Sequence, residues 1–150
     1  MYLDFPRLIR KMDDVAKASG AEVVIQTGMG KTIPEHCDHF DFKPREEILA
    51  LQEKASLIIC HAGIGSIIDA LNARKPLAVV PRLRKFGEHN NDHQCDLARA
   101  VEGRKWGRAV FEIDDLDEIC AAPPAAYTAY KPANAELIAT VRKTIEKALA

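Results

Sequence analysis

Short apolar runs alternate with helical patterns along this chain. The run at 56–60 is rich in β-branched residues, and a second apolar run occupies 77–80. Apolar residues at consecutive positions are typical of strands that are buried on both faces of a parallel sheet. Between these runs, Ile67, Ile68 and Leu71 recur at helical spacing. The pattern therefore predicts a strand, a helix and a second strand in direct succession.

Apolar runs and helical spacing of apolar residues also predict the other strands and helices. Residues 6–18 form an amphipathic pattern that ends at Gly20, which suits a helix and its C-cap. We expect Asp114 to cap a short helix. Together the patterns predict further strands at 22–26, 39–42 and 108–113, and further helices at 45–55, 92–101, 115–120 and 133–149. This alternation favours an α/β fold, a Rossmann-like parallel sheet with helices on both faces and a ligand above the carboxyl ends of the strands.

Composition and charge narrow the class of protein. The chain has 150 residues and a formal net charge of -1, so we expect one domain spanning 1–150 and no broad basic surface for nucleic acid. The four cysteines are far apart in the sequence and form no CxxC pair. This usage favours reduced thiols in a cytoplasmic protein. No apolar run approaches the ~20 residues that are needed to cross a bilayer.

A glycine turn joins the strand at 56–60 to the helix that follows it. The turn reads His61, Ala62, Gly63, Ile64, Gly65 and Ser66. The free N–H groups and positive dipole of a helix N-terminus favour an anion, and phosphate is the usual occupant. Glycine suits these positions because a side chain would block the close approach of a diphosphate. The turn therefore predicts a phosphate site, while a plain tight connection is the alternative interpretation.

A second glycine-rich segment, 28–32, ends in Gly-Lys-Thr like a P-loop. The first glycine of that motif would fall at Ile25, and Pro34 interrupts the helix that a P-loop requires. The spacing therefore argues against a P-loop.

Metal binding is a weaker alternative. Candidate ligands cluster at two places, which are His36, Cys37 and His39, and His89 and His93. Neither cluster has the glutamate that a zinc protease carries between its histidines, and nothing in the sequence joins the two. We therefore predict no metal site.

The motifs between His61 and Gln94 resemble a known family. The stretch reads His-Ala-Gly-x-Gly-Ser, then an aspartate, then Lys-Pro-x-x-x-Val-Pro, then Gly-Glu-His-x-x-Asp-His-Gln. This order resembles the C-terminal, donor-binding domain of glycosyltransferase family 28, and above all the soluble subunits of split UDP-sugar transferases in the dolichol pathway and in bacterial exopolysaccharide synthesis. The likeness covers roughly Phe5 to Ile119. It implies a domain of the GT-B C-terminal type and inverting transfer of a hexose from UDP to a lipid-linked acceptor in exopolysaccharide or glycolipid synthesis.

By this resemblance, the glycine turn holds the UDP diphosphate. The backbone N–H groups at Gly63 and Gly65 would bind it, with the Ser66 hydroxyl and the His61 imidazole assisting. Asp69 stands where the family usually has a glutamate that accepts hydrogen bonds from the ribose. Taken singly, His61 also fits a buried histidine with satisfied hydrogen bonds, and Asp69 fits a solvated helix residue.

The resemblance also assigns the uracil and the sugar. The Phe42 side chain and the backbone around it would meet the uracil ring, although plain core packing explains Phe42 equally well. The donor sugar would be contacted by Glu88, His89, Asp92, His93 and Gln94. Polar side chains suit this task because a site that hydrogen-bonds hydroxyls discriminates against analogues that lack them.

A transferase of this type needs a general base that takes the proton of the acceptor. In the two-domain architecture that base comes from the other domain, so the catalytic residue of this chain is unknown. We expect a heterodimer with a membrane-associated subunit that binds the acceptor and supplies the base. The protein would then be cytoplasmic and held at the membrane through this partner, with the UDP-sugar as donor substrate and neither a metal nor another cofactor. The helix at 133–149 is the candidate interface, and packing against its own domain is the alternative.

The start of the chain departs from the resemblance. Relatives place a strand and a glycine turn before the helix at 6–18, whereas only Met1 to Asp4 precede Phe5 and that helix here. We therefore expect a missing or exposed strand position in the sheet. A late start codon and a true truncation both explain it.

Two rival functions follow from these departures. A non-catalytic, nucleotide-sugar-binding regulatory subunit is favoured by the missing turn and by Asp69. A UDP-sugar 2-epimerase-like enzyme uses a related nucleotide pocket, but it would need a second domain.

Overall fold

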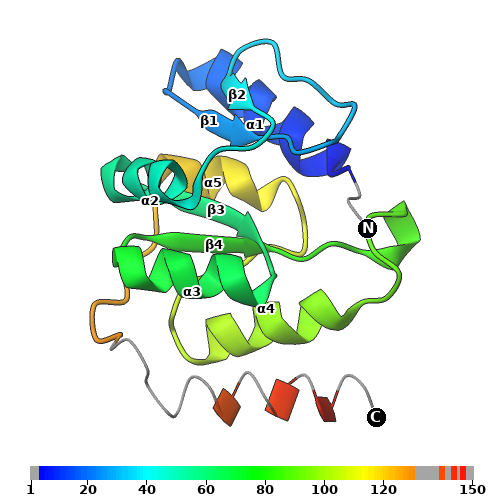
Figure 1. The fold of residues 1–150 in the computed structure, drawn as a ribbon, viewed down its shortest axis with the longest axis vertical. Helices are drawn as coiled ribbons and strands as arrows, with labels where there is room; N and C mark the ends of the chain where they lie inside the picture. The colour runs from blue at the N-terminus through cyan, green and yellow to red at the C-terminus, as the bar shows by residue number, and fades with distance from the viewer. Residues whose placement is uncertain (1–3, 131–138, 141–142, 145, 148–150) are drawn as a thin grey trace.

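Helices and strands alternate along the chain, as the sequence predicts (Figure 1). The computed structural model describes residues 4–130, 139–140, 143–144 and 146–147. In chain order the elements are α1 (Pro6–Ser19), β1 (Val24–Gln26), β2 (Asp38–Phe40), α2 (Arg45–Lys54), β3 (Ile58–His61), α3 (Ile64–Ala73), β4 (Leu77–Val80), the 3₁₀ helix η1 (Arg84–Phe86), α4 (His93–Gly103), β5 (Arg108–Ala109) and α5 (Asp115–Ala121). The helix predicted at 133–149, with its candidate interface, lies largely outside the described residues. In the part of the chain that is described, no helix has the length and apolar character needed to span a membrane.

The strands pair in parallel and fall into two sheets. β1 pairs with β2, and β3, β4 and β5 form the second sheet in that order, with Ile58 opposite Leu77. Among the described residues no ladder joins β1 to β3, although Ile25 and Ile59 pack against the same buried cluster. The described strands therefore form two parallel sheets, whereas the sequence predicted one sheet with a missing or exposed strand position.

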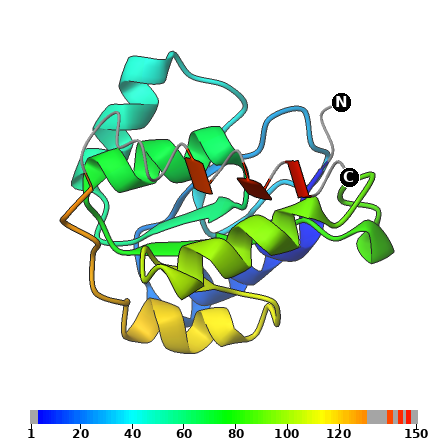
Figure 2. The same cartoon turned by 90° about the horizontal axis from the view of Figure 1, so that it is seen from below.

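β4 is the centre of the larger sheet and is buried on both faces. Its residues Leu77, Ala78, Val79 and Val80 are each 0% exposed. Because side chains alternate along a strand, Leu77 and Val79 join one buried cluster and Ala78 and Val80 the other. The first cluster lies under α3 and α4, and the second lies under α1 and α5 (Figures 1 and 2). Helices thus cover both faces, which confirms the predicted α/β layering.

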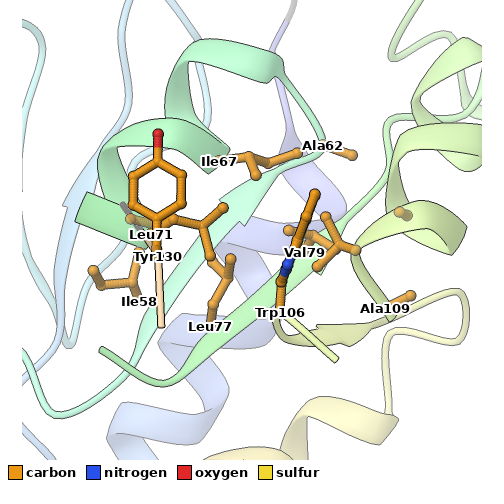
Figure 3. Close-up of a cluster of buried hydrophobic side chains, with 12 residues drawn as sticks. Ile58, Ala62, Ile67, Leu71, Leu77, Val79, Trp106, Ala109 and Tyr130 are labelled. Carbon is orange, nitrogen blue, oxygen red and sulfur yellow. The ribbon is translucent and has the colours of Figure 1, made fainter. Parts of the chain in front are cut away.

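The cluster under α3 and α4 also anchors loops (Figure 3). Trp106, which follows α4, lies beside Val79, and Tyr130 packs near Leu71 at the other side of the cluster. The rings of Trp106 and Tyr127 are tilted at 51° with their centroids 6.3 Å apart. Residues 123–130, which follow α5 without regular secondary structure, are therefore held against the sheet by aromatic side chains.

Two local predictions differ from the structure. The strand predicted at 108–113 is much shorter, since β5 spans Arg108–Ala109 and only Val110 continues with a hydrogen bond to Val79. Asp114 stands at the N-cap position of α5 but makes no side-chain capping bond. Its Oδ1 accepts a hydrogen bond from Lys11 Nζ at 3.0 Å instead, which joins α5 to α1.

Gly107 provides a test of the packing between β4 and the turn before β5. A Cβ at this position would lie 2.5 Å from the Leu77 carbonyl oxygen, whereas a Cβ at Gly103 would have no neighbour within 4 Å. We expect Gly107→Ala to lower the free energy of unfolding by about 2 kcal/mol, because backbone must shift to admit the methyl group. Gly103→Ala should leave it equal or slightly higher. Urea unfolding followed by circular dichroism measures both, and equal effects would contradict this packing.

Candidate functional site

The carboxyl end of β3 turns directly into α3. Gly63 is the N-cap of α3 in an extended conformation, and the first bond of the helix runs from Ile67 N–H to the Gly63 carbonyl oxygen at 3.0 Å. The N–H groups of Ile64, Gly65 and Ser66 therefore precede the hydrogen-bonded ladder and need partners from elsewhere. Together with the helix dipole they form a set of donors that suits an anion.

Glycine suits the two positions of this turn, Gly63 and Gly65, for different physical reasons. A Cβ at Gly63 would run into the His61 ring, so glycine here lets the imidazole lie against the turn. A Cβ at Gly65 would meet no atom within 4 Å. Open space above the first turn of α3 is what a bound diphosphate requires.

His61, Ser66 and Gln94 come together at this turn, whereas the sequence placed only His61 and Ser66 there. His61 Nε2 lies 3.4 Å from Ser66 Oγ, and His61 Nδ1 lies 3.3 Å from Gln94 Nε2. Burial lowers the pKa of the His61 imidazole, and the positive charge of Arg82 and the proximity of His89 lower it further. The ring is therefore neutral at physiological pH and acts as a hydrogen-bonding group without charge.

Gln94 is buried, with 8% of its surface exposed. Its Oε1 accepts a hydrogen bond from the Arg82 N–H at 3.0 Å, and its Nε2 faces His61. The carboxamide thus bridges the chain that leaves β4 and the end of β3. Its assignment to the donor sugar stays a prediction, and the structure gives it contacts within the protein.

Glu88 is even more deeply buried, at 2% exposure. Its carboxylate pairs with Arg7, whose Nε and Nη2 each lie 2.9 Å from one of its oxygens, and it also accepts the Leu83 N–H at 3.0 Å. Both oxygens are therefore engaged. In this structure Glu88 joins α1 to the loop after β4, and its contact with a sugar stays a prediction.

The other predicted sugar-binding residues lie in the segment that leads into α4. Asp92 is exposed, and its Oδ1 accepts the Arg84 N–H at 2.8 Å. His89 Nδ1 accepts the Asn91 N–H at 3.4 Å, and the His93 N–H donates to Asn91 Oδ1 at 3.1 Å. The side chains of this segment thus order the loop between η1 and α4, on the side of the molecule toward which β3 and β4 point (Figure 1).

The predicted ribose and uracil contacts lie on neighbouring elements. Asp69 is on α3, three residues after Ser66, so both face the same side of that helix. Its carboxylate is held by Arg45 at the start of α2, with bonds of 3.0 and 2.5 Å. Phe42 follows β2, is 54% exposed and lies 3.7 Å from where a Cβ of Gly28 would be. Its exposure excludes plain core packing as the reason for this aromatic residue.

Two predictions that concern other chemistry can be compared with the structure. Residues 28–32 lead to β2 and not to a helix, so a P-loop is absent from this segment. The loop binds a carboxylate of the protein instead, since Asp4 Oδ2 accepts the N–H groups of Lys31 and Thr32 and the Thr32 hydroxyl. Among the described residues, no three His, Cys, Asp or Glu side chains are grouped so that they could hold a metal ion.

The sequence did not predict the contacts that Arg7 and Arg82 make with Glu88 and its loop. Arg82 donates to the carbonyl oxygens of Asp4 and Glu88, and its guanidinium lies 4.6 Å from the centre of the Phe5 ring. In the sequence, Arg82 is part of a basic run with the pattern of a solvated surface. The partner of Arg7 is 81 positions away, so no local signal could have identified it.

Comparison with known proteins concerns the domain as a whole. The model of the glycosyltransferase family 28 C-terminal domain matches residues 3–146. The chain belongs to this family. A solved structure described as the glycotransferase of kitacinnamycin shares the fold of this family 28 domain, with a TM-score of 0.58 and 21% identity over 98% of this chain and 37% of that chain.

The curated relatives of this family 28 chain are transferase subunits. The UDP-N-acetylglucosamine transferase subunit ALG13 of Eremothecium gossypii is 33% identical over 113 residues, which are 68% of this chain and 51% of the relative. The human protein of the same name is 32% identical over 84 residues, which are 53% of this chain and 7% of the relative. The chain therefore spans about half of the fungal relative and a small part of the human one. The resemblance stated from the motifs is confirmed at the level of the family.

The Arg7–Glu88 pair provides a test of how α1 supports the site. We expect Arg7→Met to lower the free energy of unfolding by about 3 kcal/mol, because it leaves a buried carboxylate without its counter-charge. Arg108→Met, which removes the exposed pair of Arg108 with Glu102, should cost less than about 0.5 kcal/mol. Urea unfolding of the two variants decides the matter, and a loss for Arg7→Met no larger than the control would refute a structural role for the pair.

Proposed function

We propose that this chain is the donor-binding subunit of an inverting UDP-sugar glycosyltransferase. The observation that carries the proposal is the open N-terminus of α3, where Gly65 leaves space and His61 and Ser66 stand beside free N–H groups. Membership of glycosyltransferase family 28 supports a nucleotide-sugar ligand at this place. The names of the curated relatives, which are subunits of a UDP-N-acetylglucosamine transferase, support UDP as the nucleotide and a second subunit.

The chain's own residues suggest how UDP is held. The N–H groups at the start of α3 receive the diphosphate, and Asp69, one turn further along the same side, accepts a ribose hydroxyl. Arg45 does not prevent this role, because each carboxylate oxygen can accept more than one hydrogen bond. Phe42 supplies an exposed aromatic face for the uracil. The segment with His89, Asp92 and His93 then faces the sugar.

Transfer of the sugar builds negative charge on the leaving UDP. Fixed N–H donors and the dipole of α3 stabilise that charge without having to reorganise, which is the usual source of catalytic advantage in such sites. The proton of the acceptor hydroxyl must be taken by a general base. We assign this base to a partner subunit, so that this chain alone binds the donor but transfers little or nothing.

The acceptor in this proposal is a lipid-linked sugar at the membrane, in exopolysaccharide or glycolipid synthesis. The loop after β4 supports it modestly, because Arg84 and Lys85 are exposed beside Phe86, which is 54% exposed. Basic side chains near an anionic membrane surface are worth about 1 kcal/mol each. Membrane association would therefore come mainly from the partner subunit.

Binding of UDP provides the first test. Gly65→Leu places a side chain in the open space above the turn, so we expect calorimetry to show at least a tenfold loss of UDP affinity from steric exclusion. Gly103→Leu is the matched control, because its Cβ also meets no atom within 4 Å and lies at the end of α4. Equal UDP affinity in the two variants would contradict the proposal. A wild-type protein that does not bind UDP would contradict it as well.

Partner-dependent transfer provides the second test. Labelled UDP-N-acetylglucosamine, UDP-glucose and UDP-glucuronate are incubated with the purified chain, with membranes from cells that lack it, and with both together. We expect label in a lipid fraction only when both are present, and no label with Gly65→Leu, because donor and base lie on different subunits. Epimerisation by the chain alone would favour an epimerase instead. Binding of UDP without either reaction would favour a regulatory subunit.

A further inference from the structure

The hydrogen bonds around His61 also determine which of its ring nitrogens carries the proton. The Arg82 N–H can only donate, so the atom of Gln94 that faces it at 3.0 Å is the carbonyl oxygen Oε1. The other end of the carboxamide, Nε2, then faces His61 Nδ1 at 3.3 Å. An amide nitrogen donates and does not accept, so His61 Nδ1 must carry a lone pair and no proton.

The proton of the neutral imidazole is therefore on Nε2, which lies 3.4 Å from Ser66 Oγ. In this tautomer His61 donates to the serine oxygen, and the hydroxyl proton of Ser66 is not used by His61. In the opposite tautomer the unprotonated Nε2 would accept a hydrogen bond from the Ser66 hydroxyl. The choice of tautomer thus decides whether Ser66 can donate to a ligand at the start of α3.

We propose that Gln94 is a positioning residue that holds His61 in the Nε2–H tautomer and so keeps the Ser66 hydroxyl available as a donor to the diphosphate. The three hydrogen bonds then run in one direction: the Arg82 N–H donates to Gln94, Gln94 Nε2 donates to His61, and His61 Nε2 donates to Ser66. The proposal rests on the proposed function for the identity of the anion, but the tautomer itself is a property of the unliganded protein. It gives Gln94 a task inside the protein besides its predicted contact with the sugar.

The surroundings of His61 agree with a neutral ring. Arg82, on the chain that leaves β4, places a positive charge nearby, and His89 approaches from the loop before α4. Burial, the largest effect, lowers the pKa of the imidazole, and both neighbours lower it further. A hydrogen bond that Gln94 accepted would raise this pKa, but the Gln94 oxygen is already held by the Arg82 N–H. Protonation of Nδ1 would in addition set a donor against the Gln94 Nε2 donor.

Nitrogen NMR of the unliganded protein tests the tautomer directly. The chain is labelled at histidine, and the His61 signals are assigned by their absence from the spectrum of His61→Asn. At neutral pH we expect a pyridine-like Nδ1 and a pyrrole-like Nε2 in the wild type. In Gln94→Glu a carboxylate keeps the bond from the Arg82 N–H but accepts from His61, so Nδ1 should become protonated. Gln26→Glu, the same change at an exposed position of β1, should leave both signals as in the wild type.

A wild-type His61 that carries its proton on Nδ1 would overturn the proposal. A Gln94→Glu variant in which Nδ1 stays pyridine-like would overturn it as well. These outcomes do not depend on UDP, so they are separate from any failure of the proposed function.

Titration with UDP tests the consequence for Ser66. In the wild-type background we expect Ser66→Ala to weaken UDP binding about tenfold, as loss of a hydrogen bond to a charged group does. The same substitution is then made in Gln94→Glu, above the pH at which NMR shows that His61 has lost its second proton. There Ser66 would donate to His61, so its removal should weaken UDP binding less than twofold. Equal losses in the two backgrounds would show that Gln94 does not act through His61 and Ser66.

Discussion

Glu88 has almost no contact with water, so the fold must supply its counter-charge where it lies. Arg7 does so from α1 through two hydrogen bonds, and the Leu83 N–H completes the arrangement. The first helix and the loop after the central strand therefore cannot be packed independently of each other. That loop carries Arg82, whose backbone N–H sets the direction of the Gln94 carboxamide. The position of α1 thus influences the candidate site although α1 contributes no residue to it.

The site itself combines rigid and adaptable parts. The turn after β3 is built on a strand that pairs with a fully buried neighbour, so the donors at the start of α3 are held in place before any ligand arrives. This preorganisation is what stabilisation of a leaving diphosphate requires. The segment from His89 to His93 is held mainly by short-range bonds around Asn91 and by one bond to Arg84. Such a segment is better suited to adjust to different sugars than to stabilise charge.

Local patterns predicted the parts of this structure that depend on nearby residues. The strand 77–80 was found with its exact bounds because its apolar run is short and Pro81 closes it, and the turn from His61 to Ser66 lies within one strand–turn–helix unit. The strand at 108–113 was predicted too long because apolar periodicity reports burial and not pairing: Phe111 and Ile113 pack against the buried clusters but lie beyond β5. The tasks of Glu88 and Asp114 could not be read from the sequence, since their partners are on α1.

The interruption between the two sheets has a consequence for the backbone of β3. The Ile58 N–H donates to the Pro76 carbonyl oxygen, so by the alternation of a parallel ladder Cys60 also faces β4, whereas Ile59 faces the opposite edge. Among the described residues no strand is hydrogen-bonded to that edge. Isotope exchange at neighbouring amides of this one strand should consequently differ, slow at every second position and fast between. The strand that carries the glycine turn thus has its backbone groups paired along one side and, among the described residues, without a strand partner along the other.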